Sequence, residues 1–415
     1  MTIAEIQGTD TDTSPYSGKH VTTTGVVTAA YPTGGFNGFY LQTGGSGGEP
    51  DATPGASDGI FVFGSQSAGA VAVGESVSVA GEVQEYQGTT EITFPTVTKL
   101  AQPLPAVTAG ALPWNRLDTA AEKEAHEGEL LAPQGAFTVS DNYDTNYYGS
   151  FVLAAGTTPL AQPTDVGPAG SDAAHAAVAD NARRMITLDD GSSWNYAVFS
   201  SHTGDPLPWL TSDNHPRVGA AVTFTAPVIL EYRFDAWNLQ PAHQVTDAGT
   251  DVVTFADTRA DNQHPAAVGG DIRLATFNVE NYFATTGEEY VAKGLGTCTW
   301  YDDRQGNHVT DNRCVGTDGS AGPRGAATAA SFAKQQAKIV TGINRLDAGI
   351  VSLEEIENSV KFGEPRDAAL AGLVDALNAA SRIAGVGVRA VAGCRGPAAH
   401  GAAGRDPHRV HLQAG

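Results

Sequence analysis

Short runs of alternating apolar and polar residues fill the first hundred positions, and they predict β-strands. Gly, Pro, Asp and Ser separate the runs, as tight turns require. Alternation is clearest in Val77-Ser78-Val79, where a period of two turns one face of the strand inward. The predicted strands cover residues 20–28, 36–42, 59–63, 76–86 and 89–94.

Five short strands with a long third connection predict a small closed barrel of the oligonucleotide/oligosaccharide-binding (OB) kind over residues 1–105. A second β module is predicted over residues 125–247, after a joint rich in Pro, Ala and Leu. Four short stretches of the first region recur there in the same order, for example Asp58-Gly59 and Asp190-Gly191. Either the barrel is duplicated, so that the second module is also OB-like, or such dipeptides recur by chance.

The pattern changes after a polar stretch at residues 248–270, which reads as a linker. Over residues 271–380 we predict a strand at 271–279, a helix at 326–346 with one apolar stripe, a strand at 350–356 and a helix at 366–379. This β-α-β-α order is typical of an α/β domain with a right-handed crossover.

Composition limits the classes of function. A chain of 415 residues with 41% hydrophobic and 17% charged residues is globular and large enough for several modules. Its formal net charge of −22 excludes a general basic surface, so a nucleic-acid partner would need local basic residues or a bound divalent cation. No apolar run is long enough to span a membrane, and the first residues lack the features of a signal peptide.

Three cysteines, Cys298, Cys314 and Cys394, are too few for a disulfide framework and form no paired CxxC metal signature. Cys298 and Cys314 flank a polar loop. They predict either one loop-closing disulfide or two free thiols.

Candidate chemistry lies at the ends of the two predicted strands of the α/β domain. Asn278 ends the first strand, and Glu354 and Glu355 end the second. The carboxyl ends of neighbouring strands converge on a crevice, and carboxylate and amide oxygens suit Mg²⁺ or Ca²⁺. The alternative is an asparagine that bonds the backbone beside two solvated glutamates.

The strings around these residues, FNVENYF at 277–283 and EEIEN at 354–358, resemble extracellular nucleases of the endonuclease/exonuclease/phosphatase superfamily, which are deoxyribonuclease-I-like. The resemblance implies a fold in which an N-terminal OB-like barrel and a second β module precede part of a four-layer α/β sandwich. It also implies metal-dependent hydrolysis of phosphodiesters in DNA or RNA, and a secreted or cell-surface protein.

The same resemblance assigns roles to single residues. It implies that Glu355 binds the catalytic divalent cation, Mg²⁺ or else Ca²⁺ or Mn²⁺, and that Asn278 organises the metal and phosphate site. A bound cation offsets charge that develops on phosphoryl oxygens. The family motifs also contain residues for which we expect structural roles: Asn281, Arg324, Gln335, Lys338, Glu357 and Asn358.

The chain departs from the family after residue 380. The Tyr-Lys-Pro, Asp-x-Asn and Ser-Asp-His segments of such nucleases are absent, and residues 381–415 are rich in Gly, Ala, Arg and His. With suitable codons, reading residues 406–415 one base later gives Ile-Arg-Ile-Gly-Phe-Ile-Tyr-Lys-Pro, the missing family strand. We therefore expect a frameshifted tail and a polypeptide without nuclease activity. The alternative is a basic extension that binds nucleic acid.

Other interpretations concern binding. Four aromatic residues of the barrel are candidates for stacking on bases or, alternatively, for its core: Phe36, Tyr40, Phe61 and Tyr86. The acidic loops at 141–144, 302–303 and 311–312 are either Ca²⁺ loops or solvated turns. Alternative functions are a non-catalytic oligonucleotide- or polysaccharide-binding protein, and a phospholipid phosphodiesterase or phosphomonoesterase. The sequence defines no oligomeric state.

Overall fold

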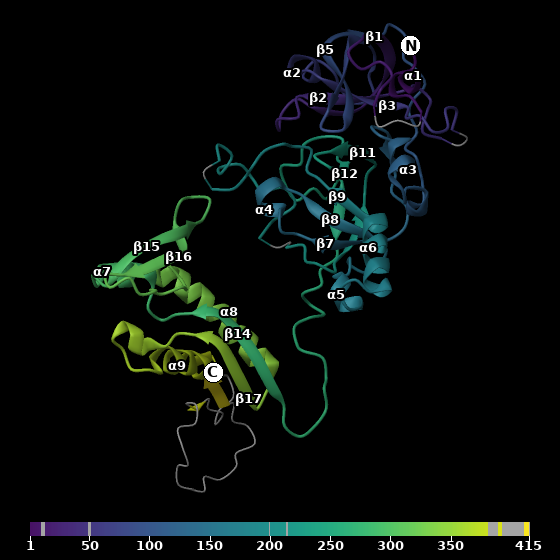
Figure 1. The fold of residues 1–415 in the computed structure, drawn as a ribbon. Coiled ribbons are helices and arrows are strands. Elements are labelled where there is room, and N and C mark those ends of the chain that lie inside the picture. Colours follow the sequence, from purple (N-terminus) through teal and green to yellow (C-terminus); the bar gives the residue numbers. More distant parts are fainter. Residues whose placement is uncertain are drawn as a thin grey trace. The chain divides into compact units, whose positions relative to one another are not determined.

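The protein is a multidomain, β-rich chain that divides into two compact units, Met1–Thr258 and Arg259–Gly415. A computed structural model describes residues 1–9, 13–48, 51–198, 200–212 and 215–380, together with the backbone of two strands at 389–391 and 411–414. Figure 1 shows the first unit in purple to teal and the second in green to yellow.

The first unit begins with a closed five-stranded barrel, in the order β1-β2-β3-β5-β4, which confirms the OB-type barrel that the alternation predicts. The pair β3–β5 is parallel, and the other pairs are antiparallel. Its strands are β1 (His20–Tyr31), β2 (Gly38–Gln42), β3 (Gly59–Phe63), β4 (Ser76–Tyr86) and β5 (Thr89–Lys99).

Two short helices accompany the barrel: α1 (Ile3–Gln7) and α2 (Ser65–Ala68). A capping box begins α1, because the Thr2 hydroxyl accepts the Glu5 N–H while the Glu5 carboxylate accepts the Thr2 N–H. Ile3 and Ile6 are fully buried and join the inward-facing residues of the strands in one core.

The second β module contains one eight-stranded sheet, in the order β13-β10-β7-β8-β9-β12-β11-β6. Its strands are β6 (Leu130–Leu131), β7 (Phe137–Asp141), β8 (Phe151–Ala155), β9 (Met185–Leu188), β10 (Ala221–Phe224), β11 (Val228–Arg233), β12 (Ala236–Gln240) and β13 (Val253–Phe255). The helical elements are η1 (Trp114–Arg116), α3 (Ala120–Glu124), α4 (Thr145–Tyr148), α5 (Pro163–Val166) and α6 (Asp172–Arg184). The sheet packs around a core that contains Phe137, Phe151 and Trp209.

Two expectations about this region are corrected. The second module is an eight-stranded sheet, not the closed five-stranded barrel that a duplication predicts. The predicted linker at 248–270 begins too early, because β13 pairs with β10 through Val222 and Phe255. The local sequence is polar and predicts a linker, whereas Val253 of this short strand and Val252 just before it are buried in the core of the sheet.

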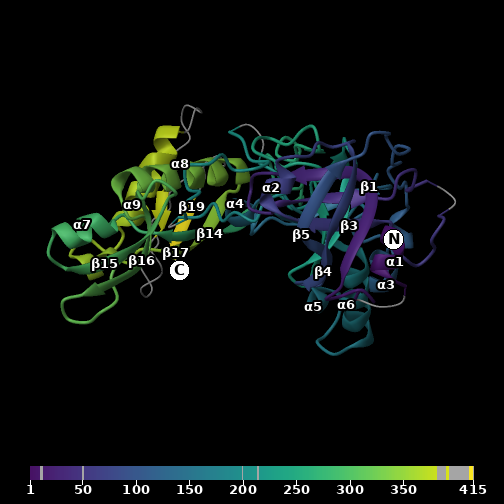
Figure 2. The same cartoon turned by 90° about the horizontal axis from the view of Figure 1, so that it is seen from above.

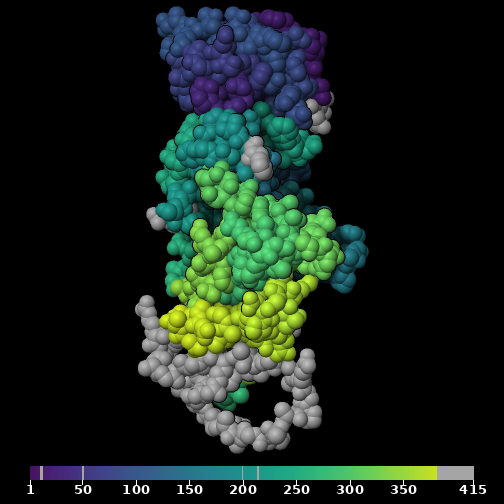
Figure 3. All heavy atoms as spheres, turned by 90° about the vertical axis from the view of Figure 1, so that its left-hand side faces the viewer, coloured from purple at the N-terminus to yellow at the C-terminus, as the bar shows by residue number. Residues whose placement is uncertain are grey.

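The barrel and the sheet share a buried contact within the first unit. The Tyr31 hydroxyl donates to the carbonyl oxygen of Pro241 at 2.6 Å, and the Thr89 hydroxyl donates to that of Tyr232. A cluster of Ala29, Tyr31 and Tyr40 from the barrel packs against Ile229 of β11. In Figure 3 the blue atoms of the barrel lie directly against teal atoms of the sheet. The two modules therefore form one body.

The second unit contains a four-stranded sheet in the order β14-β17-β19-β18. Its strands are β14 (Leu274–Tyr282), β17 (Ile350–Ile356), β18 (Arg389–Val391) and β19 (His411–Ala414), and its longer helices are α8 (Ala329–Leu346) and α9 (Ala368–Ala380). The neighbouring strands β14 and β17 are parallel, as a right-handed β-α-β unit requires. Both helices pack on one face of the sheet, as Figure 2 shows, around Val351, Leu353 and Leu373.

A disulfide-linked hairpin completes the second unit. It consists of β15 (Gly296–Asp302) and β16 (His308–Gly316), and α7 (Gly287–Ala292) precedes it. The unit also contains η2 (Ser359–Phe362), which follows β17. A disulfide bond joins Cys298 and Cys314. The hairpin replaces the predicted polar loop.

The prediction of part of a four-layer sandwich is supported only as far as an α/β unit. Within the described residues of the second unit the sheet carries helices on one face, while Leu274 and Ile350 on the other face remain 72% and 38% exposed. The structure thus supports a β-rich multidomain chain with an α/β unit, and no second facing sheet is present in the described part. Most of the tail at 381–415, and with it the frameshift prediction, lies outside the described residues; β19 pairs in parallel with β17.

Candidate functional site

The two residues expected to bind metal lie at the ends of neighbouring strands. Asn278 of β14 is paired in register with Glu354 of β17, and Glu355 follows directly. The side chains of Asn278 and Glu355 are exposed. The parallel register therefore brings an amide oxygen and carboxylates to one edge of the sheet, where polar strand ends form ligand sites in α/β proteins.

The backbone at this edge is irregular. The register shifts between Asn278 and Tyr282, and three non-glycine residues have positive φ angles: 50° at Glu280, 54° at Asn281 and 63° at Glu355. The Asn278 Oδ1 accepts the Glu280 N–H at 2.7 Å, and the Glu355 Oε2 accepts the Asn281 N–H at 3.2 Å. Strained conformations of this kind gather at functional sites, because the surrounding structure must hold them.

Helix α8 supports the irregular strand end. The Gln335 side-chain amide donates to the carbonyl oxygen of Glu280 at 2.9 Å, and the Gln336 amide donates to the Tyr282 hydroxyl at 2.6 Å. The first bond satisfies a backbone carbonyl group that the bulge removes from the strand ladder. The second fixes a tyrosine at the end of the strand. Gln335 is thus a positioning residue for this edge.

Glu357 and Asn358 have different environments. Glu357 is buried, and its carboxylate accepts the Thr285 N–H at 2.8 Å and the Ser359 hydroxyl at 2.6 Å. Asn358 is exposed and precedes η2 without a side-chain capping bond. Glu357 therefore ties the chain after β14 to the chain after β17, which is a structural task.

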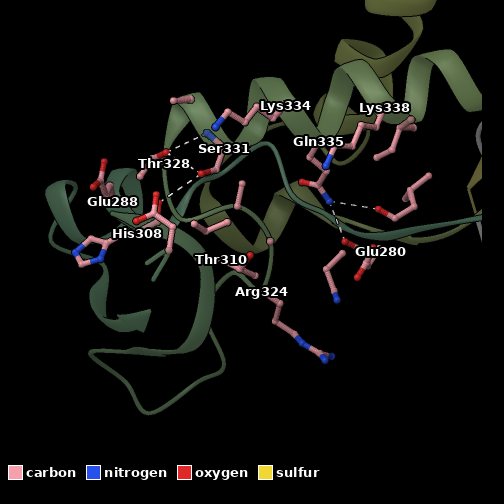
Figure 4. Close-up of a pocket in the computed structure, with 18 of the residues that line it drawn as sticks. Glu280, Glu288, His308, Thr310, Arg324, Thr328, Ser331, Lys334, Gln335 and Lys338 are labelled. Carbon is pink, nitrogen blue, oxygen red and sulfur yellow. Dashed lines mark hydrogen bonds between the residues drawn. The ribbon is translucent and has the colours of Figure 1, made fainter. Parts of the chain in front are cut away.

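A cavity of about 990 Å³ lies beside the strand ends. Asn278 lines it, whereas Glu355 is absent from its described lining. Figure 4 shows Lys334, Gln335 and Lys338 on α8 beside it. Arg324, in the segment before that helix, also lines the cavity. Among the residues predicted from the sequence, the cavity collects Asn278, Asn281, Arg324, Gln335 and Lys338.

A second hollow of about 600 Å³ adjoins the first, since Phe277 and Lys338 line both. Arg345 lines the second hollow. Lys334, Lys338 and Arg345 are exposed and follow one another along α8 at spacings of four and seven residues, which places them on one helical face. We call these three residues the α8 basic stripe.

Sequence reasoning missed a histidine on the wall of the cavity. The His308 Nδ1 lies 2.6 Å from the Asp302 Oδ1, and the His308 ring stacks on Trp300 with ring centres 4.7 Å apart. The neighbouring Asp303 accepts the N–H groups of Gln305 and Asn307, both at 2.9 Å. The acidic loop at 302–303 is thus a structured turn of the hairpin. In the sequence, the only sign of the His308–Asp302 pair is that the two residues lie six positions apart.

The predicted stacking platform of the barrel is corrected for three of its four residues. Phe36, Tyr40 and Phe61 are 4%, 0% and 1% exposed. The Arg233 guanidinium of β11 lies 4.8 Å from the centre of the Phe36 ring and 4.9 Å from that of Phe61. The faces that would receive bases are therefore covered by the second module, and only Tyr86, at 43%, is well exposed.

The donor chemistry of the strand ends fits a hard divalent cation. Glu355 offers a carboxylate and Asn278 an amide oxygen, each with lone pairs beyond the one hydrogen bond described. Mg²⁺ in particular is held by one or two protein oxygens together with water and substrate phosphates. Neither residue belongs to the one cluster of three or more His, Cys, Asp or Glu side chains that occurs among the described residues, Cys298, Asp311 and Cys314.

Comparisons with known proteins do not define a family. No protein-family model matches the chain, and no curated protein matches it. One similar solved structure, the Ifi202 HINa domain in complex with 20 bp dsDNA, has 13% identity and a TM-score of 0.23, over 54% of this chain and 92% of its own.

Two further structures are similar to the same degree. A murine DNA-binding protein bound to double-stranded DNA has 10% identity and a TM-score of 0.22, over 53% of this chain and 90% of its own. A structure on the molecular basis for abrogation of activation of pro-inflammatory cytokines has 11% identity and a TM-score of 0.23, over 58% and 93%. At TM-scores this low the likeness supports no inference about this chain. None of the described helices combines the length and apolar character needed to cross a bilayer.

Proposed function

We propose that this protein binds the phosphodiester backbone of nucleic acid through a divalent cation, and that the α/β unit belongs to a metal-dependent phosphodiesterase. One observation carries the proposal: Asn278 and the Glu354–Glu355 pair meet in register at the edge of a parallel sheet, beside a cavity lined by Arg324, Lys334 and Lys338. The strings around Asn278 and Glu355 resemble nucleases, which supports the same chemistry.

In this proposal the side chains divide the work. Glu355 and Asn278 hold the cation, which when bound offsets negative charge on the phosphoryl oxygens. Arg324 and Lys334 bind phosphate oxygens inside the cavity. Gln335 keeps the bulged end of β14 in place.

The α8 basic stripe favours a polymer over a small phosphate ester. From Lys334 to Arg345 the helix rises about 16 Å, because each residue adds about 1.5 Å. One strand of a duplex carries a phosphate about every 3.4 Å, so the stripe spans several phosphates. A phosphomonoester or a single lipid head group would contact only one end of it.

Binding without hydrolysis is the second candidate. One observation favours it: in the described part of the chain the cavity is lined by side chains that can bind a cation or a phosphate, such as Asn278 and Lys334. The cavity's one described histidine, His308, comes from the hairpin and not from the strand ends, where a general base would be needed. Products on a denaturing gel separate the two candidates, because only hydrolysis shortens the oligonucleotide.

The test compares Glu355→Gln with the matched neighbour Glu354→Gln. Fluorescence anisotropy with a labelled oligonucleotide measures affinity in Mg²⁺ and in EDTA. We expect Mg²⁺ to strengthen binding about tenfold or more in the wild type and in Glu354→Gln, and this gain to disappear in Glu355→Gln. Equal Mg²⁺ dependence in the wild type and in Glu355→Gln would contradict the proposal.

A further inference from the structure

The hairpin of the second unit contains an unusual buried cluster. Cys298 of β15 and Cys314 of β16 are directly opposite in register and form the disulfide bond. Asp311, three residues before Cys314, places a carboxylate oxygen so that it and the two sulfur atoms all lie within 4.8 Å of one another. Asp311 is 5% exposed and Cys314 is 6% exposed.

The Asp311 carboxylate has no hydrogen-bond partner for either oxygen among the described residues. Burial raises the pKa of this carboxyl group to about 7. An unpaired buried carboxylate is costly, and a group of this kind in a native protein calls for an ion, a water molecule or a function.

The fold makes room for this carboxylate. A Cβ atom at Gly287, the first residue of α7, would come within 1.9 Å of the Asp311 Oδ1. The Asp311 backbone is held on both sides: it pairs with Trp300 of β15 on one side, and on the other its N–H donates to the Gly325 carbonyl oxygen at 2.9 Å. The position of the carboxylate beside the sulfur atoms is therefore built into the hairpin.

We propose that reduction of the Cys298–Cys314 disulfide converts this cluster into a zinc site. Two thiolates and one carboxylate are ligands that Zn²⁺ takes, and a water molecule would complete a tetrahedron. Two soft sulfur donors favour Zn²⁺ over Mg²⁺ or Ca²⁺. The site is separate from the strand ends and does not depend on the proposed function.

The chemistry balances with a dithiol as the reductant. The dithiol gives two electrons and two protons, its own sulfur atoms join, and the protein S–S bond becomes two thiols. When Zn²⁺ binds, both thiol protons leave to solvent and Asp311 binds as the carboxylate. The cation thereby gives the Asp311 carboxylate the partner that it lacks in the oxidised protein.

The hairpin can hold the three ligands in place without the disulfide. Its ladder runs from the Gly296–Gly316 pair to the Asp302–His308 pair, so both cysteines stay opposite each other. Zn–S bonds of about 2.3 Å require sulfur atoms about 3.8 Å apart, a separation that side-chain rotation supplies. Because β16 also lines the cavity with Val309 and Thr310, bound zinc would fix that wall under reducing conditions.

The experiment uses the full chain with Cys394→Ser, so that only Cys298 and Cys314 supply thiols. A phosphine reduces the disulfide, takes oxygen from water to become its oxide, and is removed under argon. Co²⁺ is the probe, since thiolate coordination gives near-ultraviolet charge-transfer bands. We expect one thiolate-bound Co²⁺ per reduced chain, loss of its bands when Zn²⁺ displaces it, and no such bands in the oxidised chain.

Two variants test the role of Asp311. Asp311→Asn keeps the shape and removes the buried charge, and we expect Zn²⁺ affinity to fall about tenfold or more. Gly287→Ala displaces the carboxylate without removing a ligand and should weaken binding in the same direction. Asp303→Asn, in the exposed turn of the same hairpin, is the matched control and should bind as the parent does. No Co²⁺–thiolate bands in the reduced chain, or unchanged Zn²⁺ affinity in both Asp311→Asn and Gly287→Ala, would overturn the proposal.

Discussion

At the scale of single residues, the contact between barrel and sheet in the first unit buries more acid than base. The Tyr40 hydroxyl donates to the Glu231 carboxylate at 2.6 Å, and Glu231 pairs with Arg233. Glu127 is buried, with 1% of its surface exposed. Burial raises the pKa of Glu127 well above its usual range, and burial raises that of Glu91 to about 7. The contact therefore favours protonated acids.

This predicts a pH dependence of stability that Glu91→Gln reduces. Because the pKa of Glu91 is higher in the folded chain, the native state binds a proton that the unfolded state releases, and stability is lost as pH rises from about 4.5 to about 7. After allowance for solvent screening the loss is on the order of 2 kcal/mol. Chemical denaturation at pH 5 and pH 8 measures it. Glu91→Gln should be more stable than the wild type at pH 8.

The exposed Glu82 on β4 provides the control, since Glu82→Gln should leave the pH dependence as it is in the wild type. A Glu91→Gln chain that loses as much stability between pH 5 and pH 8 as the wild type would show that other groups set the dependence.

Residue patterns predicted the aromatic rings of the barrel but not their surroundings. Phe36 and Phe61 on short strands fit either a stacking surface or a core. Their actual partner, Arg233, lies about 170 to 200 positions away in another module, and nothing in the local sequence indicates that pairing. The same limit applies to the His308–Asp302 pair, where only the fold shows that the side chains face a cavity.

At the scale of elements, the period of the apolar positions predicted most of the framework. Strand β17 has the predicted bounds, and α8 begins three residues after the predicted start because Thr328 caps it by accepting the Ser331 N–H at 3.1 Å. The apolar stripe of α8 and the alternation of the barrel strands are visible in the sequence because the positions that face the core are apolar.

Elements with few apolar residues were missed for the same reason. The hairpin β15–β16 has mostly exposed or half-buried positions, and its strands read as a polar loop. Helix α6 has an Ala-rich sequence in which only Ala174 and Ala177 are buried. Backbone pairing, caps and the disulfide stabilise these elements, and none of these produces a strong hydrophobic period.

The α8 basic stripe makes an element-scale prediction about salt. If Lys338 contacts a phosphate, Lys338→Gln should lower the slope of log affinity against log salt for duplex DNA by about 0.9, because one fewer counterion is released. Lys361→Gln, an exposed lysine of η2 in the same unit but outside the two hollows, should leave the slope unchanged. Anisotropy titrations between 50 and 200 mM salt, about the range in which the effect is large, measure both. Equal slopes for Lys338→Gln and the wild type would remove this lysine from the interface.

At the scale of the whole molecule, a chain with net charge −22 needs its few basic residues concentrated to meet a polyanion. In the second unit several basic residues are used in ion pairs, such as Arg273 with Asp347 and Lys293 with Glu289. The three residues of the α8 basic stripe are instead exposed on one face of α8, along the two hollows. Local arrangement, and not total charge, therefore decides whether this protein can approach nucleic acid.

The division into two units predicts where a protease cuts first. The first unit ends at Thr258, and no regular element lies between β13, which ends at Phe255, and β14, which begins at Leu274. Exposed segments that lack regular structure are cut in the native state, whereas barrel strands must unfold first. Limited trypsin digestion should therefore cleave at Arg259 or Arg273 before any site inside the barrel, and mass spectrometry identifies the fragments.

The double variant Arg259→Gln/Arg273→Gln should slow this first cut about tenfold or more, since trypsin then has no basic residue in the segment. Early cleavage within β1–β5 instead would show that the barrel is less stable than its closed, buried core implies.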